Sequence, residues 1–207
     1  MSPLVIAFVG ILLVPLFVAS WRLSLFGLAV QGLLMAWIGY QLDPALDTAA
    51  AWVRLFDLVA VRGLGAPIAL YAVLRSQRVG ARNDVIPPNL MSWTLAIALV
   101  LVAFRFADML VPAEGNEQSL VAGATAGLLL GLLVLATQTG PFSQMVGVLR
   151  IENGIAFFEL GARHQPLAMA LAETLILIAT VLLFRWYLKT LPRASEVKVS
   201  AVEGMHP

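Results

Sequence analysis

The sequence has no cysteine and only two histidines, and charged residues make up 12% of its 207 residues. Without cysteine the chain can form no disulfide, offer no thiolate nucleophile and ligate no iron–sulfur cluster. With histidine so scarce, a histidine metal site is almost excluded. Hydrophobic residues make up 60% of the chain and its mean hydropathy is +0.91, so it has too little charge to cover the exterior of a water-soluble domain. The composition therefore excludes a cytosolic enzyme domain and indicates an integral membrane protein.

Apolar runs of about 20 residues, the length that a membrane-spanning helix needs, recur along the chain between polar or proline-containing breaks. The sequence predicts an all-α membrane protein with about seven transmembrane helices. Glycines in the fifth run recur at every fourth position, a spacing that suits close helix packing. The predicted spans are Leu4–Ser20, Leu23–Tyr40, Ala49–Leu74, Asn89–Val111, Ser119–Thr137, Phe142–Leu160 and Pro166–Leu191.

An odd number of spans places the two termini on opposite sides of the membrane. Most basic residues that flank the spans fall on the side of the C-terminus, and Arg163 flanks a span on the other side. By the positive-inside rule we expect the N-terminus outside and the C-terminus in the cytoplasm. We divide the chain into a four-helix part (1–112), a three-helix part (113–191) and a polar cytoplasmic tail (192–207). The basic residues on the C-terminal side are Arg22, Arg75, Arg78, Arg82, Arg185, Lys189, Arg193 and Lys198.

Three glutamates lie within the last two predicted spans. A charged side chain at the bilayer centre costs at least about 2.5 to 3.5 kcal/mol on insertion scales, so each one needs a partner or a task. Glu152 lies near the middle of the sixth span, Glu159 follows two helical turns later, and Glu173 lies in an apolar stretch of the seventh. Burial disfavours the charged form of a carboxyl, so such groups can hold a proton and exchange it when a neighbouring cation moves. They are candidate members of a proton relay.

These glutamates also have a structural interpretation, in which they lock helices together by bonding to Arg150 or to backbone groups. For Glu159 this is the preferred interpretation. Asn153 is a polar neighbour of Glu152 in the sequence. Arg62 lies near the middle of the third span, where it could tune a nearby carboxyl or extend its charged end toward the interface.

Two further charged pairs are spaced three residues apart within predicted helices, near their outer ends. Arg54 and Asp57 lie on the third span, and Arg105 and Asp108 on the fourth. Residues at this spacing face each other on an α-helix. We expect each pair to neutralise itself within its own helix.

The segment from Gln144 to Gly161, QMVGVLRIENGIAFFELG, resembles the second helix of subunit K of respiratory complex I. The following segment, PLAMALAETLILIATVLLFRWYLK, resembles the third helix of that subunit. The resemblance extends from Ser119 to the end of the chain. It implies that Glu152 and Glu173 take the places of the two glutamates of that family's proton path.

Nearly the whole chain resembles component E of hydrogenase-4, a membrane subunit of group 4 [NiFe] hydrogenase and formate hydrogenlyase-type complexes. The resemblance rests on the segment VRGLGAPIALYAVLR in the third span, the I-E-N-G motif, and the acidic last span with its short polar tail. It implies a non-catalytic subunit of a redox-driven oxidoreductase complex in the bacterial cytoplasmic membrane. Its expected partners are antiporter-like and other membrane subunits and the lipid bilayer, but no nucleic acid. In that family the place of Arg62 tends to hold a basic residue, and no cofactor is expected in this chain.

Two other functions remain open at this stage. A stand-alone secondary transporter would use the carboxyls near the midplane to bind a coupling ion, H⁺ or Na⁺, together with a substrate. A structural scaffold subunit would keep all of its internal charges permanently paired. Only the relay subunit requires carboxyls that change protonation while a larger complex turns over.

Overall fold

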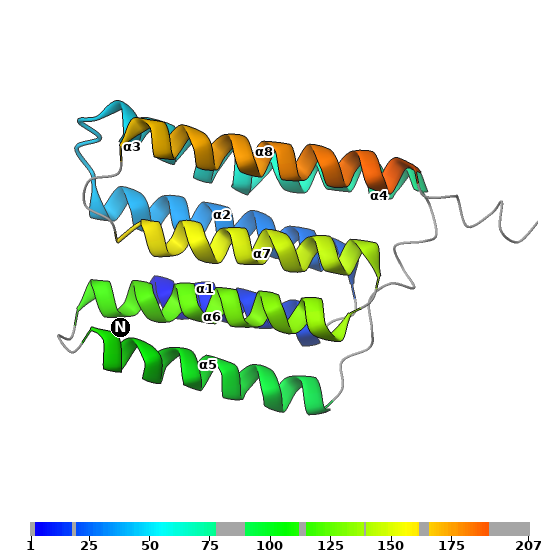
Figure 1. The fold of residues 1–207 in the computed structure, drawn as a ribbon, viewed down its shortest axis with the longest axis horizontal. Coiled ribbons are helices and arrows are strands. Elements are labelled where there is room, and N and C mark those ends of the chain that lie inside the picture. Colours follow the sequence, from blue (N-terminus) through cyan, green and yellow to red (C-terminus); the bar gives the residue numbers. More distant parts are fainter. Residues whose placement is uncertain are drawn as a thin grey trace, which may run out of the picture.

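The computed structural model describes residues 3–17, 20–77, 90–111, 115–138, 140–161 and 166–190. Of these residues 91% are helical and none lies in a strand, so the predicted all-α class is confirmed for them. The helices run side by side along one common direction (Figure 1). They are α1 (Pro3–Phe17), α2 (Trp21–Leu42), α3 (Ala49–Phe56), η1 (Asp57–Gly65), α4 (Ala66–Gln77), α5 (Leu90–Leu110), α6 (Asn116–Thr137), α7 (Pro141–Glu159) and α8 (Leu167–Thr190).

Within the described ranges, 5 helical stretches are long and apolar enough to cross a membrane. The apolar part of α1, Pro3–Leu13, is shorter, and α7 is interrupted by polar residues near its middle. The membrane character of the chain is therefore supported, whereas the count of seven spans and the orientation of the termini stay predictions. The 5 stretches are Trp21–Leu42, Ala49–Ser76, Leu90–Leu110, Asn116–Thr137 and Leu167–Thr190.

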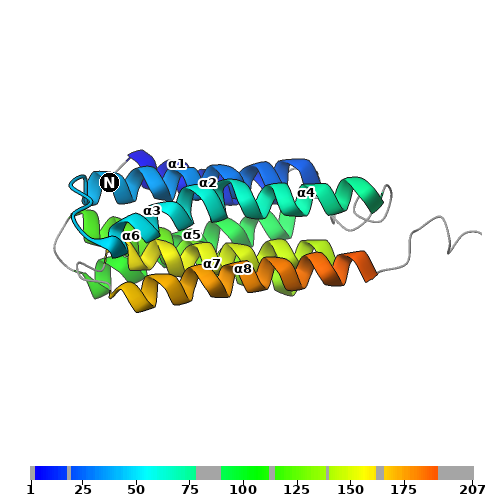
Figure 2. The same cartoon turned by 90° about the horizontal axis from the view of Figure 1, so that it is seen from above.

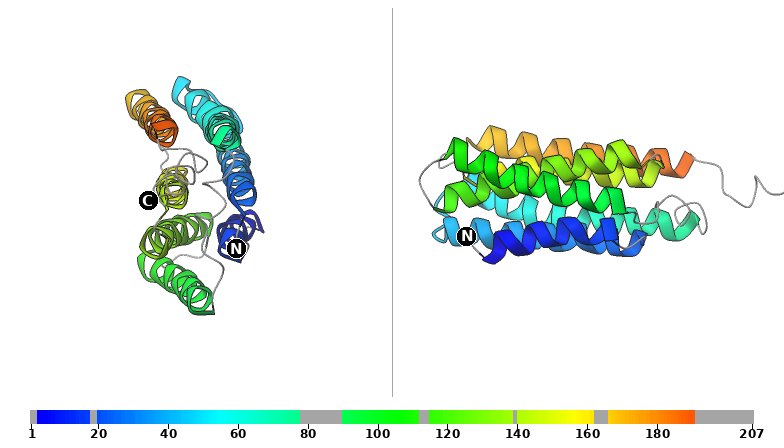
Figure 3. Two further views of the ribbon diagram at one scale, coloured as in Figure 1. Left: turned by 90° about the vertical axis from the view of Figure 1, so that its right-hand side faces the viewer. Right: turned by 90° about the horizontal axis from the view of Figure 1, so that it is seen from below.

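The helices form two layers, seen end-on in the left view of Figure 3. One layer contains α1, α2 and the rod formed by α3, η1 and α4, and the other contains α5, α6, α7 and α8. Across the interface α1 contacts α6, α2 contacts α7, and the rod contacts α8. The outer surfaces carry large exposed apolar side chains such as Phe26, Ile68 and Leu175, as expected where helices face lipid.

Glycines bring the backbones of α6 and α7 into contact. A Cβ added at Gly127 would lie 3.2 Å from the Cα of Gly154, and one at Gly131 would lie 2.7 Å from Cγ1 of Ile151. At Gly123 the nearest atom would be Cε1 of Phe157, at 2.6 Å. The close packing predicted for the glycines of this helix is therefore confirmed, and it fixes the position of α7.

The rod formed by α3, η1 and α4 is continuous, although its central stretch is a π-helix (Figure 2). In this stretch each N–H bonds a carbonyl five residues earlier, as the bond from the Ala66 N–H to the Val61 carbonyl illustrates. Pro67 follows directly and has no N–H to donate, so the hydrogen-bond ladder is also interrupted there. A Cβ on Gly32 of α2 would lie 2.5 Å from the backbone nitrogen of Gly63, so α2 and η1 touch at this point.

Candidate functional site

A buried ion pair lies within η1, where Arg62 Nε is 2.6 Å from Asp57 Oδ2. The side chain of Arg62 is 2% exposed and that of Asp57 is 7% exposed. Residues five apart do not face each other on an α-helix, but the π-helical register brings them together. The sequence predicted a pair of Asp57 with Arg54, whereas the partner found for Asp57 Oδ2 is Arg62. The expectation that Arg62 could extend toward the interface is also wrong, since its side chain is buried.

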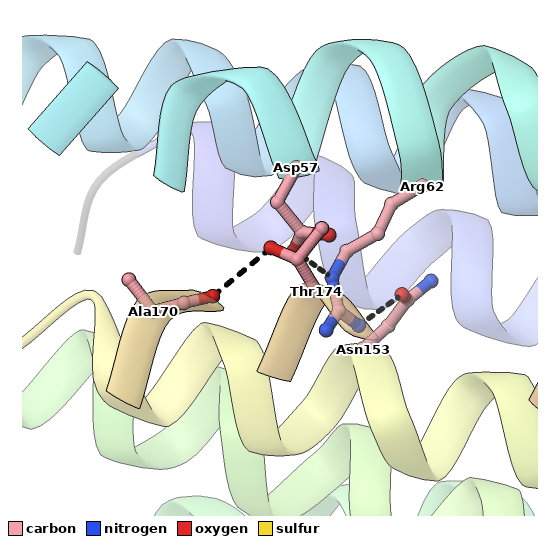
Figure 4. Close-up of polar contacts among 5 residues, drawn as sticks. All are labelled: Asp57, Arg62, Asn153, Ala170 and Thr174. Carbon is pink, nitrogen blue, oxygen red and sulfur yellow. Dashed lines mark hydrogen bonds and ion pairs between the residues drawn. The ribbon is translucent and has the colours of Figure 1, made fainter. Parts of the chain in front are cut away.

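A chain of hydrogen bonds continues from Arg62 across both layers. Arg62 Nη1 donates to Oδ1 of Asn153 on α7 at 3.2 Å, and Asn153 Nδ2 donates to Oε1 of Gln31 on α2 at 3.2 Å. Figure 4 shows the ion pair, Asn153 and the side chain of Thr174 from α8 beside them. The Thr174 hydroxyl donates to the Ala170 carbonyl at 3.0 Å. Three helical elements are thus tied together through one arginine and two amides.

The side chains of Glu159, at the end of α7, and Glu173, in α8, lie close enough to interact. Two neighbouring carboxylates repel each other, so a close pair of this kind favours a state with one negative charge rather than two. Arg62 and Arg54 both act on Glu159 as attracting charges. Glu159 Oε2 is buried and has no hydrogen-bond partner among the described residues. The structure therefore places Glu159, for which the structural role was preferred, beside a relay candidate.

Glu152 lies apart from these groups. It is half-buried on the face of α7 where Ile155 and Phe158 are 46% and 54% exposed, whereas its neighbour Asn153 is buried. No hydrogen bond or ion pair joins Glu152 to another residue of the described ranges. Glu152 and Glu173, the two relay candidates named from the sequence, are therefore not brought together directly.

Arg150 is buried in the interior, with 1% of its surface exposed. Its Nε and Nη1 atoms have no hydrogen-bond partner within the part of the chain that the structure describes. The alternative in which Arg150 bonds a glutamate of these helices is therefore not seen in that part of the chain.

Arg105 and Asp108 are exposed on α5, away from the polar groups described above. Asp108 Oδ1 accepts a hydrogen bond from Gln118 Nε2 of α6 at 2.9 Å. No ion pair joins Arg105 to Asp108 in the described part of α5, so the expected pairing within this helix is not seen.

We call the buried and half-buried polar residues at the meeting of α2, η1, α7 and α8 the polar core. Gln31 and Thr174 belong to it and were not singled out from the sequence, although a lone amide within an apolar span was a usable signal for Gln31. Among the described residues, no group of three or more His, Cys, Asp or Glu side chains could hold a metal ion. The members of the polar core are Gln31, Asp57, Arg62, Arg150, Asn153, Glu159, Glu173 and Thr174.

The fold and the polar core together define a multi-helix membrane protein with ionisable groups in its interior. Comparison with protein-family models, with curated proteins and with solved structures found no match. The resemblance to hydrogenase-4 component E and to complex I subunit K therefore stays an expectation that rests on short motifs.

Proposed function

We propose that this chain is a membrane-arm subunit of a complex I-like or group 4 hydrogenase-type assembly in the bacterial cytoplasmic membrane. In this proposal its buried carboxyls carry protons, or Na⁺, while the redox chemistry takes place in other subunits. The closeness of Glu159 and Glu173 carries the proposal, because two carboxyl groups side by side in an apolar bundle are suited to holding and passing a proton.

In this proposal Arg62 is the cation that controls proton release and uptake by the two glutamates. Arg62 pairs with Asp57 and also acts on Glu159 through space. A shift of its guanidinium toward the glutamates would favour their ionised form and the release of a proton, and a return to Asp57 would favour uptake. The π-helical backbone that carries both residues supports this role, since such stretches are frequent at functional sites.

Glu152 would connect the relay to a neighbouring subunit. It is half-buried on an outward face of α7 and lies near the midplane predicted from the sequence. An ionisable residue at that depth usually faces protein or water rather than lipid. In the assembled complex its carboxyl would exchange protons with a group on the partner.

The partner claim is tested by purification of the full chain through a C-terminal tag in mild detergent, followed by mass spectrometry. We expect antiporter-like membrane subunits together with hydrogenase-like and iron–sulfur proteins. Recovery of the chain alone, stable and monodisperse, would contradict the proposal and favour an independent ion-coupled transporter.

The relay claim is tested in the intact complex with Glu152→Gln and Glu173→Gln. We expect each to lower proton translocation per turnover, with Glu117→Gln at the start of α6 as a control carboxyl outside the polar core. If both relay variants pump as the wild type does, the relay assignment is wrong, and a scaffold role becomes the better account.

A further inference from the structure

The polar core is asymmetric along the direction of the helices. Asp57 precedes Arg62 in the rod, and Glu159 follows Asn153 in α7, which runs the opposite way (Figure 1). Its three carboxyls, from Asp57, Glu159 and Glu173, therefore lie toward the end where α3 and α8 begin. Arg150, one helical turn from Asn153, lies on the opposite side, toward the end where α4 and α8 finish.

Beyond Arg150 in that direction the interior is mainly apolar, with two buried serines, Ser24 of α2 and Ser143 of α7, among the apolar side chains. Leu70 of α4, Met145 of α7 and Val181 of α8 are 0%, 0% and 6% exposed and belong to one packed cluster. The sequence of environments along the core is thus carboxyls, then the Arg62–Asn153–Gln31 chain, then an arginine, then a mainly apolar region that contains two buried serines. A proton that enters among the carboxyls meets the positive charge of Arg150 before it reaches these serines.

Unlike Arg62, Arg150 has no counter-charge within the described ranges. Among the described residues it takes part in no ion pair, and its Nε and Nη1 atoms make no hydrogen bond. A guanidinium stays charged under ordinary conditions, and an unpaired buried charge destabilises the fold. A side chain kept at a cost to stability indicates a functional role. Its depth also excludes a partner that approaches from outside the bundle.

We propose that Arg150 is a fixed cationic barrier that closes the polar core to protons on the side where α4 and α8 end. An arginine placed in a narrow polar path excludes protons and other cations by electrostatic repulsion. The barrier confines exchange to the carboxyl side, so that protons do not leak through this chain without being coupled to redox chemistry. The inference rests on the proposed function in one respect, since it takes the core carboxyls as groups that exchange protons.

The test uses the full-length chain in liposomes that contain a pH-sensitive dye. Proton entry is measured after a potassium diffusion potential is imposed with valinomycin. We expect the wild type to be tight and Arg150→Met to admit protons at least about tenfold faster. Arg150→Lys keeps the charge and stays tight. Arg105→Met, which removes an exposed arginine of α5 outside the core, is the matched control and behaves as the wild type does.

Two further measurements separate a barrier from a structural role. Adding Glu173→Gln to Arg150→Met should slow the leak, because the leak would pass through the core carboxyls. Arg150→Met should also resist unfolding at least as well as the wild type, because it removes an unpaired buried charge. An Arg150→Met chain that unfolds or is clearly less stable overturns the proposal, since the arginine then has a structural partner. A folded Arg150→Met chain that stays tight overturns it as well.

Neither measurement needs another subunit or an electron donor. Failure of the barrier therefore leaves the partner claim of the proposed function standing. If the wild-type chain purifies without partners and the Arg150→Met variant leaks protons, the assembly claim is wrong and the barrier proposal stands.

Discussion

Two faces of α7 make contacts of opposite kinds. Toward α6 the contact is centred on glycines whose added Cβ atoms would collide with the backbone or with aromatic or branched side chains. Toward η1 and α2 the contact consists of a few hydrogen bonds around Asn153. Within the described part of the chain, every side chain with an unsatisfied buried polar atom belongs to the polar core: Gln31, Asp57, Arg150 and Glu159.

The contact of α7 with α6 is rigid, whereas its contact with the polar core can rearrange. Backbones in van der Waals contact leave no room for a second arrangement of α6 and α7. Polar groups that lack part of their bonding gain free energy from new partners, so the polar core can adopt alternatives. One side of α7 therefore holds the helix in place while the other side can change its bonding and protonation.

The largest effect that would test this contrast is expected from Asp57→Ala. It leaves Arg62 buried without its counter-charge, which costs about 3 to 5 kcal/mol of unfolding free energy. Unfolding in mixed detergent micelles with increasing SDS measures the loss. The double variant Asp57→Leu, Arg62→Met should recover most of it, because both charges are then absent. A loss under about 1 kcal/mol would mean that the ion pair is open to water.

A smaller loss is expected at the contact between α6 and α7 from Gly131→Ala. The new methyl group would lie 2.7 Å from Ile151 Cγ1 and 3.1 Å from the Gly147 carbonyl oxygen, and overpacking of this kind costs about 1 to 3 kcal/mol. Gly10→Ala in α1 is the matched control, since no atom lies within 4 Å of its added Cβ. The control should be neutral or stabilising, because alanine is the better helix former. Equal behaviour of the two variants in the same unfolding assay would refute the close packing.

Asn153→Ala removes the amide that links Arg62 to Gln31. We expect a loss of about 1 to 2 kcal/mol, because both partners keep buried polar atoms that then lack a bond. A double-mutant cycle with Gln31→Ala measures the coupling between the two amides, which should be at least about 0.5 kcal/mol. Additive losses would show that the two side chains do not interact.

The smallest effect is expected from Arg105→Ala. Arg105 is exposed and forms no ion pair with Asp108, so its removal should change the unfolding free energy by less than about 0.5 kcal/mol. A larger loss would restore the helix-internal pair expected from the sequence.

Much of the fold could be predicted from residue types. The apolar runs indicated the helices, and the glycines of the fifth run indicated the tight contact of α6, because both signals depend only on local spacing. The polarity of the third and sixth runs likewise pointed to Arg62, Asn153 and Glu159.

The choice of partners could not be predicted in the same way. The pairing of Asp57 with Arg54 assumed 3.6 residues per turn, and the π-helical stretch changes which residues share a face. The contact between Glu159 and Glu173 depends on the relative height of two helices, which no spacing within one helix determines. Gln31 lies on a helix from the other half of the chain, so its bond to Asn153 is a property of the tertiary structure.

The π-helical stretch also has a consequence for sequence comparison. Each hydrogen-bonded loop in Asp57–Gly65 holds one residue more than the loop of an α-helix. A chain that lacked Ala60 would space the aspartate and the arginine four apart, which is a facing distance on an ordinary α-helix. The ion pair could then survive the loss of the widened turn. In an alignment, a one-residue gap between Asp57 and Arg62 would therefore mark a change from π-helix to α-helix. Both aligned chains would keep the buried ion pair.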